Sequence, residues 1–175
     1  MKNIYKITLI LFFFTTFFEK NVFANDLYFI DYSKVMNEST AGKKAQKTLS
    51  DLLKSSNKKF NDTAKKLKEE ENKIISQKNV LTKDDYRKKA DGLRKKVFDL
   101  NKQREKSLRD IASKRKKAGD EMLKNLNPVL GKYMEQNNIT VIIDKKNVLM
   151  GNKKFEITSQ IIEILKKNLK SINLN

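Results

Sequence analysis

Side chains suited to acid–base or metal chemistry are scarce in this chain. Histidine and cysteine are both absent, so the usual general bases, a Cys/His metal site and a disulfide are all missing. Adjacent carboxylates stand at Glu69-Glu70-Glu71 and Asp84-Asp85. Neighbours on a helix point in different directions, so we interpret both clusters as solvated salt-bridge faces. With no Gly-rich phosphate loop either, we expect a protein that is not an enzyme and holds no cofactor or metal.

Charge is the more informative property. The net charge is +18, from 39 basic and 21 acidic residues, which favours anionic partners such as nucleic acid, anionic lipid or acidic protein. Residues 41–126 hold 27 basic and 13 acidic residues, whereas 25–40 and 127–175 together hold 9 and 7. In an AT-rich genome, compositional drift would add lysine to all exposed surfaces of the protein alike. The asymmetry therefore favours a functional basic segment over compositional drift.

The first 24 residues have the pattern of a secretory signal peptide. Lys2 and Lys6 precede an apolar stretch at 7–18, and Val22-Phe23-Ala24 suits a cleavage site. The alternative is an uncleaved anchor, but twelve helical residues span only about 18 Å of a hydrocarbon core about 30 Å thick. We expect cleavage after Ala24 and export of a soluble mature chain, which argues against nucleic acid as the partner.

Apolar residues at helical spacing predict two long helices within residues 41–126. A reversal near residues 79–82, with Thr82 and Asp85 as a cap, predicts that they fold back as an antiparallel coiled-coil hairpin. Polar residues interrupt the contact line between the helices, so we expect a flexible arm; they are Ser56, Glu70, Arg104 and Arg115. Apolar residues off this line are candidate contacts for an unfolded or membrane-bound partner. These are Leu53, Ile75, Val80, Phe98 and Leu123.

The two ends of the mature chain predict a small body. Strands are expected at 27–32, 139–143 and 148–150, with a helix restarting at Asn127-Pro128 and a last helix capped by Thr158. A body of about 65 residues with three strands is too small for a comfortable core, so we expect self-association. The fold class is mostly α with a small β body. Candidate residues of the subunit interface are Phe29, Ile30, Val141, Ile143 and Val148.

The order of these parts resembles the Skp/OmpH family of periplasmic chaperones for outer-membrane proteins. The resemblance rests on Ile30-Asp31 leading to Lys34-Val35, on the segment 39–45, on 139–144 and Val148-Leu149, and on Ile157-Thr158. It implies a homotrimer whose bodies pool their strands into a β-barrel-like core. Three arms would surround a cavity that holds an unfolded outer-membrane protein without ATP. No motif settles whether the chain binds lipopolysaccharide.

Two other functions remain open from the sequence. The chain could be a structural periplasmic protein whose arms bind a dedicated folded partner or the anionic surface of the envelope. It could also bind nucleic acid if the N-terminus is misread and stays uncleaved in the cytoplasm. Binding to diverse unfolded proteins would distinguish the chaperone from the first, and cleavage with export would distinguish it from the second.

Overall fold

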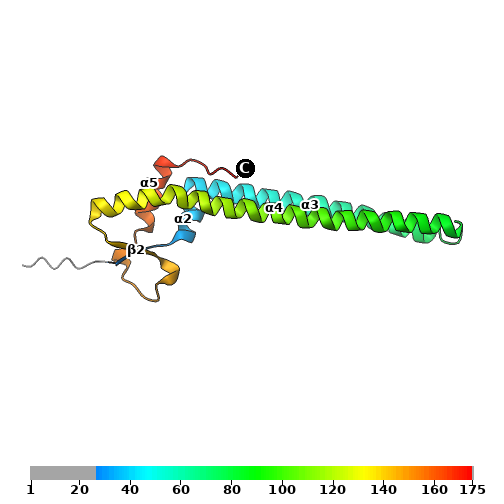
Figure 1. Ribbon diagram of the computed structural model, residues 1–175, viewed down its shortest axis with the longest axis horizontal. Helices are drawn as coiled ribbons and strands as arrows, with labels where there is room; N and C mark the ends of the chain where they lie inside the picture. The colour runs from blue at the N-terminus through cyan, green and yellow to red at the C-terminus, as the bar shows by residue number, and fades with distance from the viewer. Residues whose placement is uncertain (1–26, 175) are drawn as a thin grey trace, which may run out of the picture.

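A computed structural model describes residues 27–174 of the chain. Two long helices lie side by side and extend from a small body that contains the short strands and the last helix (Figure 1). The predicted signal peptide, residues 1–24, lies outside the described residues. In chain order the helices and strands are β1 (Leu27–Ile30), α2 (Tyr32–Glu38), α3 (Thr40–Ser76), α4 (Lys83–Asn137), β2 (Val141–Asp144) and α5 (Thr158–Asn168).

Side-chain caps define where three of the helices begin. Asp31 accepts a hydrogen bond from the Lys34 amide at the start of α2, and Ser39 accepts one from the Gly42 amide at the start of α3. Thr82 accepts from the Asp85 amide at the start of α4, as the sequence predicted. Helix α2 was not predicted. Strand β1 ends at Ile30, because Asp31 is already the cap of that helix.

The long helices α3 and α4 run in opposite directions from the turn at residues 77–82. Ser56 contacts Ser107 near the body, and Glu70 pairs with Lys96 farther out. Beside the turn, Lys89 Nζ donates to Gln77 Oε1. The residue numbers of the partners on α4 thus fall as those on α3 rise. At about 1.5 Å per residue, the 55 residues of α4 span roughly 82 Å.

The predicted restart at Asn127-Pro128 is wrong, because α4 continues through Pro128 to Asn137. Proline removes one backbone hydrogen bond from a helix, but packing on both sides offsets that cost. Leu126 is buried in the body, and Val129, Leu130 and Tyr133 pack against the same cluster. Asn138 caps the end of the helix and has the left-handed conformation, with φ 52°.

The body contains a two-stranded parallel sheet among the described residues, with Leu27 opposite Val141 and Ile30 opposite Asp144. On the other edge of β1, the Ile157 amide donates to the Phe29 carbonyl at 3.1 Å. Residues 148–150 form no strand, so the strand predicted there is wrong. Asp144 instead accepts from the Lys146 amide and starts a 3-10 turn at Lys145–Asn147, after which the chain leaves the sheet.

The core of the body gathers residues from both ends of the chain. Val35 of α2, Met122 and Leu126 of α4, and Ile161 and Leu165 of α5 are all buried in one cluster. Met122 and Leu126 belong to the segment 41–126 that the sequence assigned to the arm. The base of the arm and the body therefore share a core, so the arm is fixed to the body by packing.

Thr158 has a role other than the predicted cap. Helix α5 begins at Thr158, but its cap residue is Ile157 and no side chain caps it. The Thr158 hydroxyl instead accepts a hydrogen bond from the Asp31 amide at 2.9 Å and donates to Glu156. This buried hydroxyl ties the start of α5 to the junction between β1 and α2.

Candidate functional site

The outer faces of α3 and α4 carry exposed ion pairs one turn apart. Lys47 and Lys58 each lie 2.8 Å from an aspartate four residues on, Asp51 and Asp62. A hydrogen bond from the lysine is the main reason that the pKa of each aspartate is lowered. Exposed pairs of this kind contribute little to stability. Since residues 41–126 contain 27 basic and 13 acidic side chains, pairing of this kind still leaves the arm strongly positive.

Four of the five candidate contact residues on the arm are exposed. Val80 lies in the turn at the tip with 84% of its surface exposed, and Phe98 on α4 is 67% exposed. Ile75 and Leu123 are also exposed. Leu53 is only partly exposed. No single surface gathers all five, because they are spread from the tip of the arm to its base.

Phe98 borders a groove in the outer half of the arm, here called the distal groove, with a volume of about 610 Å³. Its apolar lining comes from both helices; the residues are Ala64, Leu67, Leu93, Val97, Phe98 and Leu100. Lys68 and Arg94 stand at the rim, each paired with a carboxylate. Lys95 and Lys102 lie one turn from Phe98 on α4. The groove therefore offers apolar contacts within a basic surrounding.

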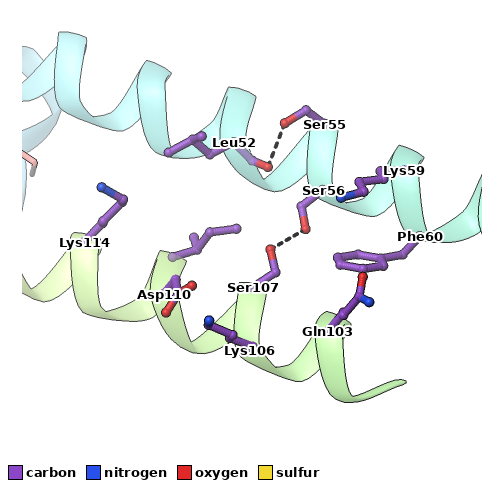
Figure 2. A pocket seen from close by; sticks show the side chains of 11 residues that line it. Leu52, Ser55, Ser56, Lys59, Phe60, Gln103, Lys106, Ser107, Asp110 and Lys114 are labelled. Atoms are coloured by element: carbon purple, nitrogen blue, oxygen red, sulfur yellow. Dashed lines mark hydrogen bonds between the residues drawn. The ribbon is translucent and has the colours of Figure 1, made fainter. Parts of the chain in front are cut away.

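A second groove, here called the middle groove, has a volume of about 450 Å³ and lies nearer the body. Figure 2 shows Ser56 of α3 and Ser107 of α4 hydrogen-bonded across it, with their Oγ atoms 2.8 Å apart. Leu52, Phe60 and Ile111 supply its apolar lining. Its other lining residues are Ser55, Lys59, Gln103, Lys106, Asp110 and Lys114. Two small hydroxyls at this level leave space that larger side chains would fill.

The sequence missed this alignment of the two helices. It placed Arg104 on the contact line and did not single out Ser107. Arg104 is exposed and reaches α3 only through a long hydrogen bond to Asn61, whereas Ser107 faces α3 directly. The available signal was Ser56, a small polar residue on the apolar line of the first helix. A small polar residue at the matching level of the second helix completes a polar layer, which the spacing of apolar residues alone does not reveal.

The candidate interface residues of the body differ in exposure. Phe29 and Ile30 are buried within the chain itself. Ile143 and Val148 are partly exposed, and Val141 is exposed on β2. The sequence did not single out Leu149 and Met150 as surface residues, yet both are almost fully exposed. They follow the 3-10 turn as a pair of large apolar side chains without cover in the chain.

Two further polar contacts join parts of the body, in addition to the Thr158 hydroxyl. The Tyr32 hydroxyl donates to the Gly119 carbonyl at 2.9 Å and so joins α2 to α4. Burial, with a smaller contribution from Asp120, raises the pKa of Tyr32. Lys145 Nζ lies 3.0 Å from a Glu156 carboxylate oxygen, and this hydrogen bond is the main reason that the pKa of Glu156 is lowered. Both contacts stabilise the arrangement of these segments within the body.

Neither a metal site nor a membrane-spanning helix is found within the described part of the chain. No group of three or more acidic side chains gathers in residues 27–174 as metal ligands would. None of the helices formed by these residues is both long and apolar enough to cross a bilayer. The features with binding potential in this part of the chain are the basic arm, its grooves and the exposed apolar residues.

Comparison with known proteins assigns the family. The family model for outer membrane protein (OmpH-like) matches residues 26–165, which include the body, both arm helices and most of α5. The chain belongs to the OmpH-like family. No curated protein matches the chain.

A solved structure shares the fold of this OmpH-like protein. It is a crystal structure of a candidate outer membrane chaperone (OmpH-like) from Caulobacter crescentus CB15, with a TM-score of 0.76 at 16% sequence identity. The match covers 84% of the present chain and 87% of the other. The arrangement of long helices on a small body is thus retained at low sequence identity.

Proposed function

We propose that this protein is an ATP-independent holdase of the periplasm that binds unfolded outer-membrane proteins and prevents their aggregation. The observation that carries the proposal is the distal groove, where Phe98, Val97 and Leu67 form an open apolar surface on a strongly basic arm. Membership of the OmpH-like family supports a chaperone role.

Holding combines attraction at long range with many weak contacts. The surplus of basic residues on α3 and α4 draws in acidic segments of an unfolded chain, and this attraction is screened by salt. Apolar side chains such as Phe98 and Val80 then remove apolar client surface from water, at roughly 25 cal/mol per Å². Each contact is weak, so a client is retained without being fixed in one conformation.

The proposal includes a homotrimer in which bodies formed by residues 25–40 and 127–175 pool their strands into a barrel-like core. Support comes from Val141, Leu149 and Met150, which leave apolar surface uncovered in the single chain. The outer edge of β2 has no strand beside it among the described residues. Three antiparallel coiled-coil arms, residues 41–126, would then enclose a cavity for the client.

The proposed location follows from the signal peptide that the sequence predicts at residues 1–24, whose cleavage after Ala24 would release the chain into the periplasm. In that compartment the basic arm meets the anionic surfaces of the envelope as well as unfolded proteins in transit. Contact with an anionic membrane surface is thus part of the proposal. It would bring the holdase close to the membrane where its clients insert.

Charge and apolar variants of the arm test the proposal. In the first variant, Lys95→Glu/Lys102→Glu reverses two charges beside Phe98. The matched control, Lys132→Glu/Lys167→Glu, makes the same charge change at exposed lysines of the body. An unfolded outer-membrane β-barrel protein is diluted from urea with each variant, and its aggregation is followed by light scattering. We expect the arm variant to hold the client several-fold less well, and the control to match the wild type.

Phe98→Ser tests the apolar part separately. Phe98 is mostly exposed, so the substitution should leave the melting temperature near that of the wild type while weakening protection of the client. Equal protection by the wild type, Phe98→Ser and the charge variant would rule out the distal groove and its flanking lysines as the client surface. Saturable binding of one folded envelope protein, without protection of unfolded clients, would instead establish the structural role.

A further inference from the structure

The C-terminal tail, residues 169–174, lies along the base of the arm after α5 ends. Figure 1 shows it returning from α5 beside the start of α3. The tail has no helix or strand structure, yet Ile172 and Leu174 pack against a buried cluster of Ala45, Leu49 and Ala118. It also lies beyond residues 26–165, the range shared with the family.

The tail uses two kinds of contact that an extended peptide can make. Its apolar residues Ile172 and Leu174 are two positions apart, so in an extended chain they point to one face. The exposed Asn173 lies between them. The backbone is held as well, since Lys114 Nζ donates to the Leu174 carbonyl at 3.0 Å. An unfolded polypeptide could make both kinds of contact, because they use only apolar side chains and a backbone carbonyl.

The middle groove begins beside Leu174, the last tail residue that the structure describes. Lys114, which binds the Leu174 carbonyl, is also a lining residue of that groove. Along α3, Leu49 under the tail is followed by Leu52 of the groove, and along α4, Ala118 is followed toward the tip by Lys114 and Ile111. From Lys114 to Gln103 the axis of α4 covers about 16 Å, enough for about five residues of extended chain.

We propose that the base of the arm and the middle groove form one binding site for extended polypeptide with apolar side chains at alternate positions, and that the tail occupies its inner part as a built-in competitor. Strands of outer-membrane β-barrels have this alternation. The inference rests on the proposed function for the identity of the natural occupant, an unfolded outer-membrane strand. Leu52, Phe60 and Ile111 receive its apolar side chains, and Lys59 and Lys106 attract acidic ones.

Tethering makes the competition effective. A segment joined by a short linker is present at an effective concentration in the millimolar range, so it fills a weak site even when free peptide does not. A client must therefore displace the tail or enter beside it. Release of the tail exposes the full length of the site, so apparent affinity for extended apolar segments should rise.

The test uses the full chain and a fluorescent peptide made of two tandem copies of residues 169–174. Ile172→Asn/Leu174→Asn removes the apolar contacts of the tail, and Ser171→Asn adds the same side chain at an exposed position of the tail as the control. Fluorescence anisotropy should show at least tenfold tighter binding to the double variant than to the wild type or Ser171→Asn. In the released background, Leu52→Lys should weaken binding again. Equal binding to the wild type and the released variant, or none to either, overturns the inference.

A disulfide variant, compared in its oxidised and reduced forms, tests the inference even if the double variant misfolds. The chain contains no cysteine, so Lys114→Cys/Leu174→Cys introduces the sole thiol pair, and oxidation within one chain, checked by mass under denaturing conditions, locks the tail in place. The oxidised form should bind the tandem peptide at least tenfold less tightly than the reduced form, and equal binding overturns the inference. The client-aggregation assay is run in parallel. Peptide binding without protection refutes the holdase alone, whereas protection without peptide binding refutes the groove alone.

Discussion

Replacing Gly42 by alanine tests how the arm is fixed to the body. Gly42 is buried in the first turn of α3, where this helix passes close to α2. An added Cβ would lie 2.1 Å from the Met36 carbonyl oxygen and 2.8 Å from its carbon. Both are backbone atoms, so they cannot move aside as the end of a flexible side chain would. The two helices would have to separate.

The expected magnitude follows from two opposing effects. Overpacking of a tight contact costs about 1–3 kcal/mol, while alanine recovers up to about 1 kcal/mol of helix propensity. A contact as close as 2.1 Å places the overpacking cost in the upper part of that range, so the net loss is about 1–2 kcal/mol, which lowers the melting temperature by about 2–8 °C for a chain of this size. The matched control is Gly92→Ala in α4, where an added Cβ meets nothing within 4 Å. It should raise stability by about 0.5–1 kcal/mol.

Thermal melting followed by far-UV circular dichroism measures both changes. The variants must be compared at one protein concentration, because the stability of the proposed trimer would depend on that concentration. Melting of Gly42→Ala at or above the wild-type temperature would refute the close approach of α2 and α3. So would an equal loss in Gly92→Ala, since the effect would then not depend on the contact with Met36.

Three further predictions concern polar contacts. Because the pKa of Glu156 is lowered in the folded chain, its contact with Lys145 stabilises the fold above the usual carboxyl pKa, and this stabilisation is lost as the pH falls through the lowered pKa. Glu156→Gln should therefore cost about 0.5–1 kcal/mol of unfolding free energy at neutral pH and nothing in acid. A difference in melting temperature from the wild type that persists in acid would contradict this. Tyr32→Phe loses the bond to Gly119 and should cost about 1 kcal/mol in urea unfolding, whereas an unchanged midpoint would refute that contact. Ser56→Ala and Ser107→Ala should each cost up to about 1 kcal/mol but less than additively together, and strict additivity in a double-mutant cycle would show that the hydroxyls are not coupled.

Local signals explain what the sequence could predict. The two long helices follow from apolar residues that recur every three or four positions, and the start of α4 follows from Thr82 and Asp85 three residues apart. The exposure of Val80 and Phe98 follows from their place off that repeat. Each of these signals is contained within a few turns of one helix, so no knowledge of distant contacts is needed.

Contacts between distant residues explain what the sequence could not predict. Pro128 stays inside α4 because Leu126 and Val129 pack on a core that α5 completes. Residues 148–150 form no strand, and it is residues 156–157 that contact the free edge of β1. The polar pair Ser56 and Ser107 depends on how α3 and α4 align. The tail was missed for the same reason, since its groove is made by residues from two other helices.

The most direct test of the central claim is a holding assay with the chain from Asn25 onward, after its mass is fixed by light scattering. An unfolded outer-membrane β-barrel protein is diluted from urea into low and high salt with and without this chain. We predict a trimer that keeps the client soluble at low salt and protects it less as salt rises, because the basic arms supply the long-range attraction. A trimer that leaves aggregation unchanged at every salt concentration would contradict the holdase function, and a monomer would contradict the cavity between three arms.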